Sequence, residues 1–224
     1  MIEYPTIENS SKSPRGNCVA FIKFDGSNFR AKWTNKQGFS TFGSRHELID
    51  INHKFLGESV KIFKEKYEEV LHEFFKKDEL TRNEREIIVY GEFFGAKSFA
   101  GIHLSDDPKE LVIFDVLVGH KNRKFYSPLD FVKTFQNLVD IPPVLYCGNL
   151  NDQLIQDVRD GKYTPEFHKL TNSKFSLFEG VVCKGTIRTG AARGNMWMCK
   201  IKTQEYFNAL RNKWGEEGIK KYGE

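Results

Sequence analysis

Charged residues interrupt several apolar, strand-like stretches of this chain. A buried charge is costly unless it is paired with an opposite charge or used in chemistry. One such residue is usually a satisfied ion pair or an outward-facing position, whereas several indicate strand faces that converge on a polar cleft. The interrupting residues are Lys23, Glu92, Asp115, Glu179, Lys200 and Lys202. On this pattern alone, a set of charges that only neutralise one another remains an open alternative.

The three lysines suit covalent chemistry at phosphorus. A lysine amine attacks only when it is neutral, so its ordinary pKa of about 10.4 must be lowered by desolvation or by nearby cations. Lys200 and Lys202 alternate with Cys199 and Ile201, and the two-residue period of a strand places both lysines on one face. We expect them to supply the charge beside Lys23 and to offset the charge of a triphosphate as its leaving group departs.

Two carboxylates and one aromatic residue suit the rest of a nucleotide site. Glu179 follows Phe178 and precedes a glycine and an apolar run, and its oxygens are suited to hold Mg²⁺ directly or through water. Glu92 could accept hydrogen bonds from a ribose, and Phe114 could stack on a purine base. The pattern therefore predicts a site for a nucleotide and its metal.

The elements that must position these residues are strands with helices outside them. Apolar alternation on both sides of Asp25-Gly26 predicts a β-hairpin from Cys18 to Trp33. Other strands are expected over residues 39–42, 86–94, 111–118, 175–184 and 196–202, with a loop and a short strand over 97–104. Helices are expected over residues 58–77, 129–139 and 150–158, and after an N-cap at Thr203. The fold class is therefore α+β, with antiparallel sheets and helices packed outside them.

Composition limits the kinds of protein that this chain can be. Its 224 residues are 39% hydrophobic and 29% charged, and its net charge of +4 does not by itself indicate nucleic acid. It has no apolar segment near the ~20 residues that span a bilayer, and its first residues lack the pattern of a signal peptide. Cys18, Cys183 and Cys199 lie in apolar runs, so we expect buried free thiols in a reducing compartment. We therefore expect a cytoplasmic or otherwise intracellular protein.

Six stretches, taken in order, resemble the motifs of the covalent nucleotidyltransferases. This superfamily contains the ATP-dependent DNA and RNA ligases and the mRNA capping enzymes, and the RNA ligase 2-like ligases are the most similar group. The matching stretches are Lys23-Phe24-Asp25-Gly26-Ser27-Asn28, Ser44-Arg45, Tyr90-Gly91-Glu92-Phe93-Phe94-Gly95, Phe114-Asp115, Phe178-Glu179-Gly180-Val181-Val182-Cys183-Lys184 and Lys200-Ile201-Lys202. Each motif is weak alone, but the ordered set is specific and covers about residues 18 to 203.

The resemblance implies a role for each matching residue. Lys23 would be the nucleophile that accepts AMP, and Glu179, Lys200 and Lys202 would be the other catalytic residues, with Glu179 holding the metal. The implied nucleotide-binding set is Lys23, Asp25, Gly26, Asn28, Arg45, Glu92, Phe114, Glu179, Lys200 and Lys202. In it, Arg45 would contact phosphate, Glu92 the ribose and Phe114 the adenine. Asn28 would help to position the RNA end.

The resemblance also implies a fold and an activity. Residues 1–224 would form one nucleotidyltransferase domain, ATP-grasp-like, with a central nucleotide cleft and without the C-terminal OB or helical domain that relatives usually carry. The implied enzyme is an ATP-dependent RNA ligase that forms lysyl-AMP, adenylylates a 5′-phosphate and seals it to a 3′-hydroxyl. Expected cofactors are ATP and Mg²⁺, or Mn²⁺ in its place. The expected partner is nucleic acid with these ends, as RNA or an RNA/DNA nick, bound by a monomer away from any membrane.

Other functions remain open at this point. Asp25 stands where RNA ligase 2-like proteins often have histidine, and aspartate is commoner there in DNA ligases and capping enzymes, so the catalytic domain of a DNA ligase is an alternative. A capping guanylyltransferase would load GMP and should carry an OB domain. A non-catalytic module that binds nucleotides or nucleic-acid ends is the third alternative, which the intact Lys23, Glu179, Lys200 and Lys202 disfavour. The basic stretch 185–194 fits a contact with a phosphate backbone and an ordinary solvated hairpin equally well.

Overall fold

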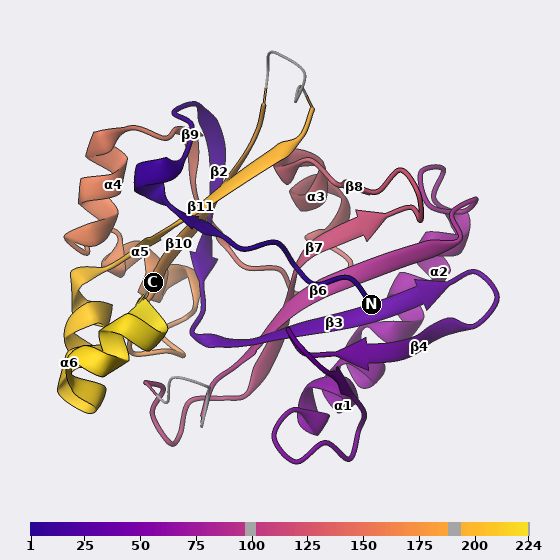
Figure 1. Cartoon of the computed structure of the whole chain (residues 1–224), viewed down its shortest axis with the longest axis horizontal. Helices are drawn as coiled ribbons and strands as arrows, with labels where there is room; N and C mark the ends of the chain where they lie inside the picture. The colour runs from indigo at the N-terminus through magenta and orange to yellow at the C-terminus, as the bar shows by residue number, and fades with distance from the viewer. Residues whose placement is uncertain (97–101, 188–193, 224) are drawn as a thin grey trace. The chain divides into compact units, whose positions relative to one another are not determined.

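The chain has an α+β fold, as predicted (Figure 1). The computed structural model describes all residues except 97–101, 188–193 and 224. These residues form two compact units, each assembled from separate stretches of the sequence. The first unit comprises residues 1–5, 27–93 and 110–141, and the second comprises residues 6–26, 94–109 and 142–224. A single nucleotidyltransferase domain over the whole chain stays a prediction.

The first unit contains a six-stranded sheet in the order β5-β4-β3-β6-β7-β8. Its strands are β3 (Gly26–Thr34), β4 (Gly38–Gly43), β5 (Leu48–Ile49), β6 (Glu86–Phe94), β7 (Glu110–Val118) and β8 (Lys124–Phe125). Its helices are α1 (Gly57–Lys66), α2 (Glu68–Lys77) and α3 (Pro128–Phe135). The strands predicted over residues 39–42, 86–94 and 111–118 are confirmed.

The single helix predicted over residues 58–77 is instead two helices that meet at Tyr67. There the backbone leaves the helical region, with φ of −124°. The buried Tyr67 hydroxyl lies within hydrogen-bond distance of two acceptors, the Leu111 carbonyl oxygen at 2.6 Å and Asp140 Oδ2 at 2.7 Å. A periodic apolar pattern continues across this break, which is why the sequence predicted one helix.

The second unit contains a five-stranded sheet in the order β1-β11-β10-β2-β9. Its strands are β1 (Glu8–Asn9), β2 (Asn17–Lys23), β9 (Val144–Asn149), β10 (Gly180–Thr186) and β11 (Met196–Lys202). Its helices are η1 (Ser10–Lys12), α4 (Asp152–Arg159), α5 (Thr164–Leu170), α6 (Gln204–Gly218) and η2 (Ile219–Gly223). Strand β1 runs parallel to β11, and the other neighbours in this sheet run antiparallel.

The predicted hairpin from Cys18 to Trp33 is wrong. Strand β2 pairs with β10 on one edge and with β9 on the other, whereas β3 pairs with β4 in the other sheet. Because both hydrogen-bonding edges of β2 are occupied, β3 cannot pair with it. The Phe24-Asp25 step is therefore a connection between two sheets, and it leaves Lys23 at the end of a central strand.

Other predicted elements differ at their bounds. The helices predicted over 129–139 and 150–158 are the shorter or shifted α3 and α4, and β10 starts at Gly180 instead of residue 175. Strands β1 and β9 and helix α5 were not predicted. Helix α6 begins as expected, because Thr203 is its N-cap and accepts a hydrogen bond from the Tyr206 backbone N–H. The short strand expected within 97–104 and the centre of the basic loop lie largely outside the described residues.

The cysteines behave as predicted from their sequence environment. All four are free thiols; Cys18, Cys183 and Cys199 are buried in the second unit, and Cys147 is exposed. Among the described residues, none belongs to a helix long and apolar enough to cross a membrane.

Gly180 fixes the point where three strands end together. It lies opposite Lys23 of β2 and opposite Lys202 of β11. Directly opposed residues of a sheet point to the same face, so the two lysine side chains flank one glycine. Gly180 has φ of +146°, and a Cβ there would lie 2.0 Å from the Ile201 carbonyl oxygen. Only glycine therefore permits this close approach of β10 to β11.

We expect Gly180→Ala to lower the free energy of unfolding by about 2 kcal/mol or more, because the new methyl group clashes with backbone and the positive φ becomes strained. Urea unfolding followed by circular dichroism measures this. The matched control is Gly16→Ala, where a Cβ would meet no atom within 4 Å. Equal stability of the two variants would contradict the assignment of Gly180 as a close-approach position.

Candidate active site

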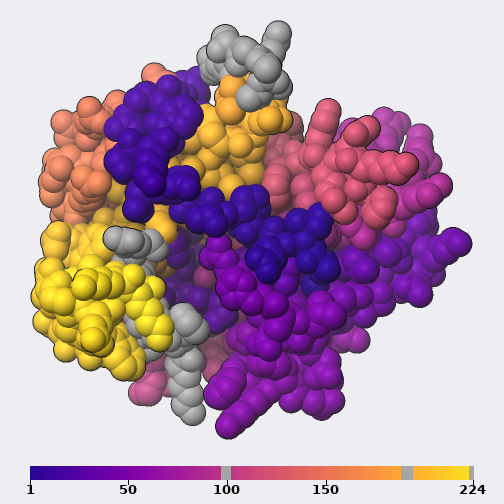
Figure 2. All heavy atoms as spheres, in the orientation of Figure 1, coloured from indigo at the N-terminus to yellow at the C-terminus, as the bar shows by residue number. Residues whose placement is uncertain are grey.

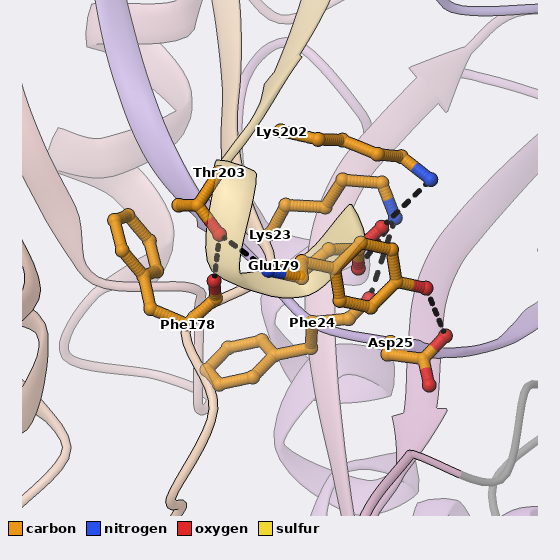
Figure 3. Close-up of polar contacts among 8 residues, drawn as sticks. Lys23, Phe24, Asp25, Phe178, Glu179, Lys202 and Thr203 are labelled. Atoms are coloured by element: carbon orange, nitrogen blue, oxygen red, sulfur yellow. Dashed lines mark hydrogen bonds and ion pairs between the residues drawn. The ribbon is translucent and has the colours of Figure 1, made fainter. Parts of the chain in front are cut away.

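A buried carboxylate holds two lysines at the ends of three strands of the second unit (Figure 3). Glu179 Oε2 lies 2.9 Å from Lys23 Nζ, and Glu179 Oε1 lies 3.1 Å from Lys202 Nζ. Glu179 is 2% exposed and Lys202 is 8% exposed. One carboxylate therefore uses both of its oxygens to bind the ammonium groups of two different strands.

The backbone around Thr203 holds Glu179 in this place. The Thr203 N–H donates to the Glu179 carbonyl oxygen at 2.9 Å, and the Thr203 hydroxyl donates to the Phe178 carbonyl oxygen at 2.8 Å. The same hydroxyl accepts the Tyr206 N–H at 3.1 Å as the cap of α6. The segment before β10 is thus fixed to the start of α6, one residue after Lys202.

Burial and pairing act in opposite directions on this cluster. Burial by itself would raise the pKa of Glu179, but the charges and hydrogen bonds of Lys23 and Lys202 outweigh it, and the pKa of Glu179 is lowered. Burial lowers the pKa of Lys202, and pairing with Glu179 opposes that change only in part. Lys23 and Lys202 thus bring two positive charges to Glu179, and the Asp25 carboxylate also acts on Lys202.

Two more lysines share the face that carries Lys23 and Lys202. Lys200 lies opposite Val182, two residues from Lys202 along β11, so the predicted placement of Lys200 and Lys202 on one face is confirmed. Lys184 lies on the same face of β10, is buried, and has its Nζ 5.2 Å from the centroid of the Phe21 ring. Lys184 belongs to the fifth of the matching stretches but was not predicted as a site residue.

Asp25 lies in the charge field of the same cluster. Burial and the charge of Glu179 raise the pKa of Asp25, while Lys23, a hydrogen bond from Tyr206 and His103 oppose that rise. The Tyr206 hydroxyl donates to Asp25 Oδ1 at 3.1 Å, and Lys202 Nζ lies 5.0 Å from the centroid of the Tyr206 ring. Tyr206 was predicted only as an apolar member of the last helix.

A histidine–aspartate pair lies close to Asp25 and was also missed. His103 Nδ1 and Asp107 Oδ2 are 2.7 Å apart, and both side chains are buried. His103 packs against the rings of Phe94 and Phe175. Phe24, which follows the candidate nucleophile, stacks on Phe94 with the ring centroids 4.0 Å apart. The sequence carries no signal for this pair, because a histidine and an aspartate four residues apart in a polar stretch are common.

Of the other predicted site residues, Gly26 belongs to the second unit, and the rest lie in the first. Arg45 is exposed in the loop between β4 and β5, and Glu92 is half-buried on β6. Phe114 of β7 is half-buried, and its ring centroid lies 4.8 Å from that of Tyr4. Asn28 lies on β3, and its Oδ1 is buried with no hydrogen-bond donor among the described residues. Their part in the site stays a prediction.

Asp115 has a structural role. It is buried on β7 and accepts a hydrogen bond from the Tyr4 hydroxyl within the first unit. Asp115 thus accepts a hydrogen bond from a neutral group, whereas Lys23, Glu179 and Lys202 form an ionic cluster.

Glu179 fits the metal role predicted for it as one ligand among several. Within the described residues, no group of three or more histidine, cysteine or acidic side chains could hold a metal ion. Mg²⁺ is commonly bound through one or two carboxylates together with substrate phosphates and water. A single buried carboxylate beside a sheet face that carries several lysines suits that donor set.

The fold is one that RNA ligases share. A model of the RNA ligase family matches residues 16–200, and the chain belongs to the RNA ligase family. No protein with a curated description matches the sequence.

Solved structures show the same fold. A mutant of Naegleria gruberi RNA ligase with AMP and Mn has a TM-score of 0.63 at 13% identity, with 92% of this chain and 57% of that chain covered. An archaeal ATP-dependent RNA ligase has a TM-score of 0.64 at 12% identity, with 94% and 50% covered. Naegleria gruberi RNA ligase with PPi has a TM-score of 0.60 at 15% identity, with 94% and 60% covered. The chain thus spans between half and three-fifths of the length of these structures.

We expect Glu179→Gln to lower the free energy of unfolding by about 3 kcal/mol at pH 7, because two ammonium groups lose their buried counter-charge. The folded pKa of Glu179 lies below its ordinary value of 4.5, so its contribution is present above that value and disappears as pH falls through the folded pKa. The difference between wild type and variant should therefore be constant above pH ~5.5 and shrink below pH ~4.5.

Urea unfolding at several pH values measures this difference. The control is Glu216→Gln, which removes the exposed partner of Arg211 and should change stability little. A difference for Glu179→Gln that does not depend on pH would show that the carboxylate charge is not what stabilises the cluster.

Proposed function

We propose that this chain is an ATP-dependent RNA ligase that works through a lysyl-AMP intermediate. The observation that carries the proposal is the pairing of Lys23 and Lys202 with the one buried carboxylate of Glu179. Membership of the RNA ligase family supports it. A nucleophile, a neighbouring cation and a carboxylate at the ends of adjacent strands are what nucleotidyl transfer to lysine requires.

In the first step, Lys23 Nζ attacks the α-phosphorus of ATP. A nitrogen–phosphorus bond forms, the bond from phosphorus to the bridging oxygen breaks, pyrophosphate leaves, and the lysine loses its extra protons to solvent. Lys200 and Lys202, which share the face of Lys23, would offset the charge of the leaving pyrophosphate. Positioning and charge stabilisation dominate such in-line displacements.

In the second step, an oxygen of a 5′-phosphate attacks the lysine-bound AMP, and the nitrogen–phosphorus bond breaks. In the third step, a 3′-hydroxyl attacks the 5′-phosphate, loses its proton and displaces AMP. Glu179 would hold the Mg²⁺ or Mn²⁺ ion, which supplies positive charge next to the reacting phosphate when bound. A bound phosphate would replace the carboxylate as partner of the two lysines and so free Glu179 for that role.

The residues of the first unit complete the proposal. We assign phosphate contact to Arg45, ribose contact to Glu92, adenine stacking to Phe114 and positioning of the RNA end to Asn28. Asp25 and Gly26 complete the nucleotide-binding set. The substrate is nucleic acid with a 5′-phosphate and a 3′-hydroxyl, bound by a monomer. Four free cysteines support a reducing, intracellular environment.

One residue favours a second candidate. Asp25 stands where aspartate is commoner in DNA ligases, so the catalytic domain of a DNA ligase is the alternative.

We expect nicked duplexes whose 3′-hydroxyl strand is RNA to be sealed at least about tenfold faster than duplexes with a DNA strand there, because a site that bonds the 2′-hydroxyl rejects the analogue lacking it. The measurement is a time course of sealing on denaturing gels. Faster sealing of the DNA strand would favour the catalytic domain of a DNA ligase.

We expect wild-type protein to form a covalent adduct with ATP labelled at its α-phosphate, in Mg²⁺ and without nucleic acid. Lys23→Ala should abolish the adduct, because the nucleophile is gone, and should keep the circular dichroism spectrum. Label is read on a denaturing gel, and peptide mass spectrometry locates AMP. The control is Lys169→Ala, which changes an exposed lysine of the same unit.

Each other outcome has a definite meaning. A Lys23→Ala variant that still becomes labelled would show that the nucleophile is misassigned. Label from GTP and not from ATP would indicate a capping-type guanylyltransferase. Absence of any adduct from folded protein that is not already adenylylated would favour the non-catalytic binding module.

A further inference from the structure

One buried tyrosine connects two of the candidate catalytic segments. Tyr206 is 1% exposed in the first turn of α6. Its hydroxyl donates to Asp25 Oδ1 at 3.1 Å, and its ring centroid lies 5.0 Å from Lys202 Nζ. Figure 3 shows the Asp25 carboxylate and the Lys202 ammonium near the Glu179 cluster. Tyr206 thus contacts one residue from the first motif and one from the last.

Packing alone does not account for these contacts. The ring of Tyr206 packs with the buried Leu210 and the partly buried Ile102, Leu177 and Ile219, and a phenylalanine would fill the same space. A buried tyrosine hydroxyl needs a hydrogen-bond partner, and here that partner is an acidic side chain. The exposed residues of α6 form part of the surface in yellow (Figure 2), so the helix has an outer face that takes no part in this arrangement.

We propose that Tyr206 is a positioning residue for nucleotidyl transfer, acting on Asp25 through its hydroxyl and on Lys202 through its ring. This inference rests on the function proposed above. It gives helix α6 a functional role, although none of the matching sequence stretches covers this helix.

The ring gives Lys202 a partner that does not compete with phosphate. In the structure, Lys202 binds Glu179, and in the proposed mechanism a phosphate oxygen takes the place of that carboxylate. A cation above an aromatic face is attracted to the ring quadrupole while its remaining N–H groups stay available as donors. The Tyr206 ring can therefore keep the ammonium in place while its acceptor changes from carboxylate to phosphate.

The hydroxyl orients a carboxylate two residues after the nucleophile. Asp25 is half-buried, and burial and the charge of Glu179 both disfavour its ionised form. A hydrogen bond donated to the carboxylate stabilises that form and fixes its direction. Thr203 caps the turn that carries Tyr206 and also binds the backbone at Phe178 and Glu179. The position of Tyr206 is thus coupled to that of the ionic cluster.

Two substitutions separate the hydroxyl from the ring. Tyr206→Phe keeps the ring and should slow adduct formation at saturating ATP about tenfold, the usual size of a lost hydrogen bond to a charged group, with little change in KM for ATP. Tyr206→Leu also removes the contact with Lys202 and should raise KM. Tyr146→Phe is the matched control, because its hydroxyl donates to the Asn149 carbonyl oxygen elsewhere in the same unit. That control should react as the wild type does.

A double-mutant cycle tests whether the hydroxyl acts through Asp25. If it does, Asp25→Ala combined with Tyr206→Phe should react no more slowly than Asp25→Ala alone. Full additivity of the two losses, or a wild-type rate for Tyr206→Phe, would overturn the assignment. A rate that only follows the folded fraction measured by urea unfolding would reduce Tyr206 to a packing residue.

A binding measurement separates this inference from the proposed function. In the Lys23→Ala background no adduct can form, so calorimetric titration with ATP and Mg²⁺ reports binding alone. Adding Tyr206→Leu should weaken ATP binding about tenfold, and adding Tyr206→Phe should weaken it less. If the Tyr206 variants bind ATP more weakly but wild-type protein forms no adduct, the proposed ligase is refuted and the role of Tyr206 in positioning the ATP-binding residues is kept. Normal adduct formation, with unchanged ATP binding and unchanged rates in all Tyr206 variants, would keep the proposed ligase and refute the positioning role of Tyr206.

Discussion

The second unit depends on one carboxylate that satisfies two buried ammonium groups. Glu179 brings Lys23 and Lys202 together, although like charges repel and a buried lysine is costly. Each oxygen binds one lysine, and so neither cation is left without a counter-charge. This arrangement needs β10 between β2 and β11, because only a central strand places its end beside both neighbours. The same requirement makes Gly180, opposite both lysines, the residue that decides how closely the strands approach.

In the proposed mechanism, the cluster also supplies a counter-charge for the buried lysines before an anionic ligand binds. In the proposed mechanism, a phosphate oxygen would take the position that Glu179 occupies beside Lys23 and Lys202. That exchange would keep both lysines paired with an anion. The residues that surround the pair but do not join it, Tyr206 and Thr203, therefore matter as much as the pair. In the proposed mechanism they would hold Lys202 and Glu179 in place while phosphate replaces Glu179 as the partner of the lysine.

The sequence predicted local features of this site well and distant ones poorly. Alternation along β11 was enough to place Lys200 and Lys202 on one face, and Thr203 was recognised as a helix cap, because both are properties of neighbouring residues. The hairpin around Asp25 failed because alternation shows that a strand exists but not which strand pairs with it. The hydroxyl of Tyr206 could not be predicted, because its partner is 181 residues away. In a helical pattern, a tyrosine with that spacing is indistinguishable from an ordinary core residue.

A charge inside an apolar, strand-like stretch was the first sequence signal of a site. That signal does not say what the charge binds in the folded chain. Both Asp115 and Glu179 were predicted inside apolar strands, and both are almost fully buried, but Asp115 lies within β7 whereas Glu179 directly precedes β10. Asp115 accepts a hydrogen bond from the neutral hydroxyl of Tyr4, which is enough to satisfy a core carboxylate. Glu179 binds two cations that come from two other strands, and a fold gains little stability from concentrating charge in this way. Only the folded chain reveals that Glu179 lies between two cations from other strands.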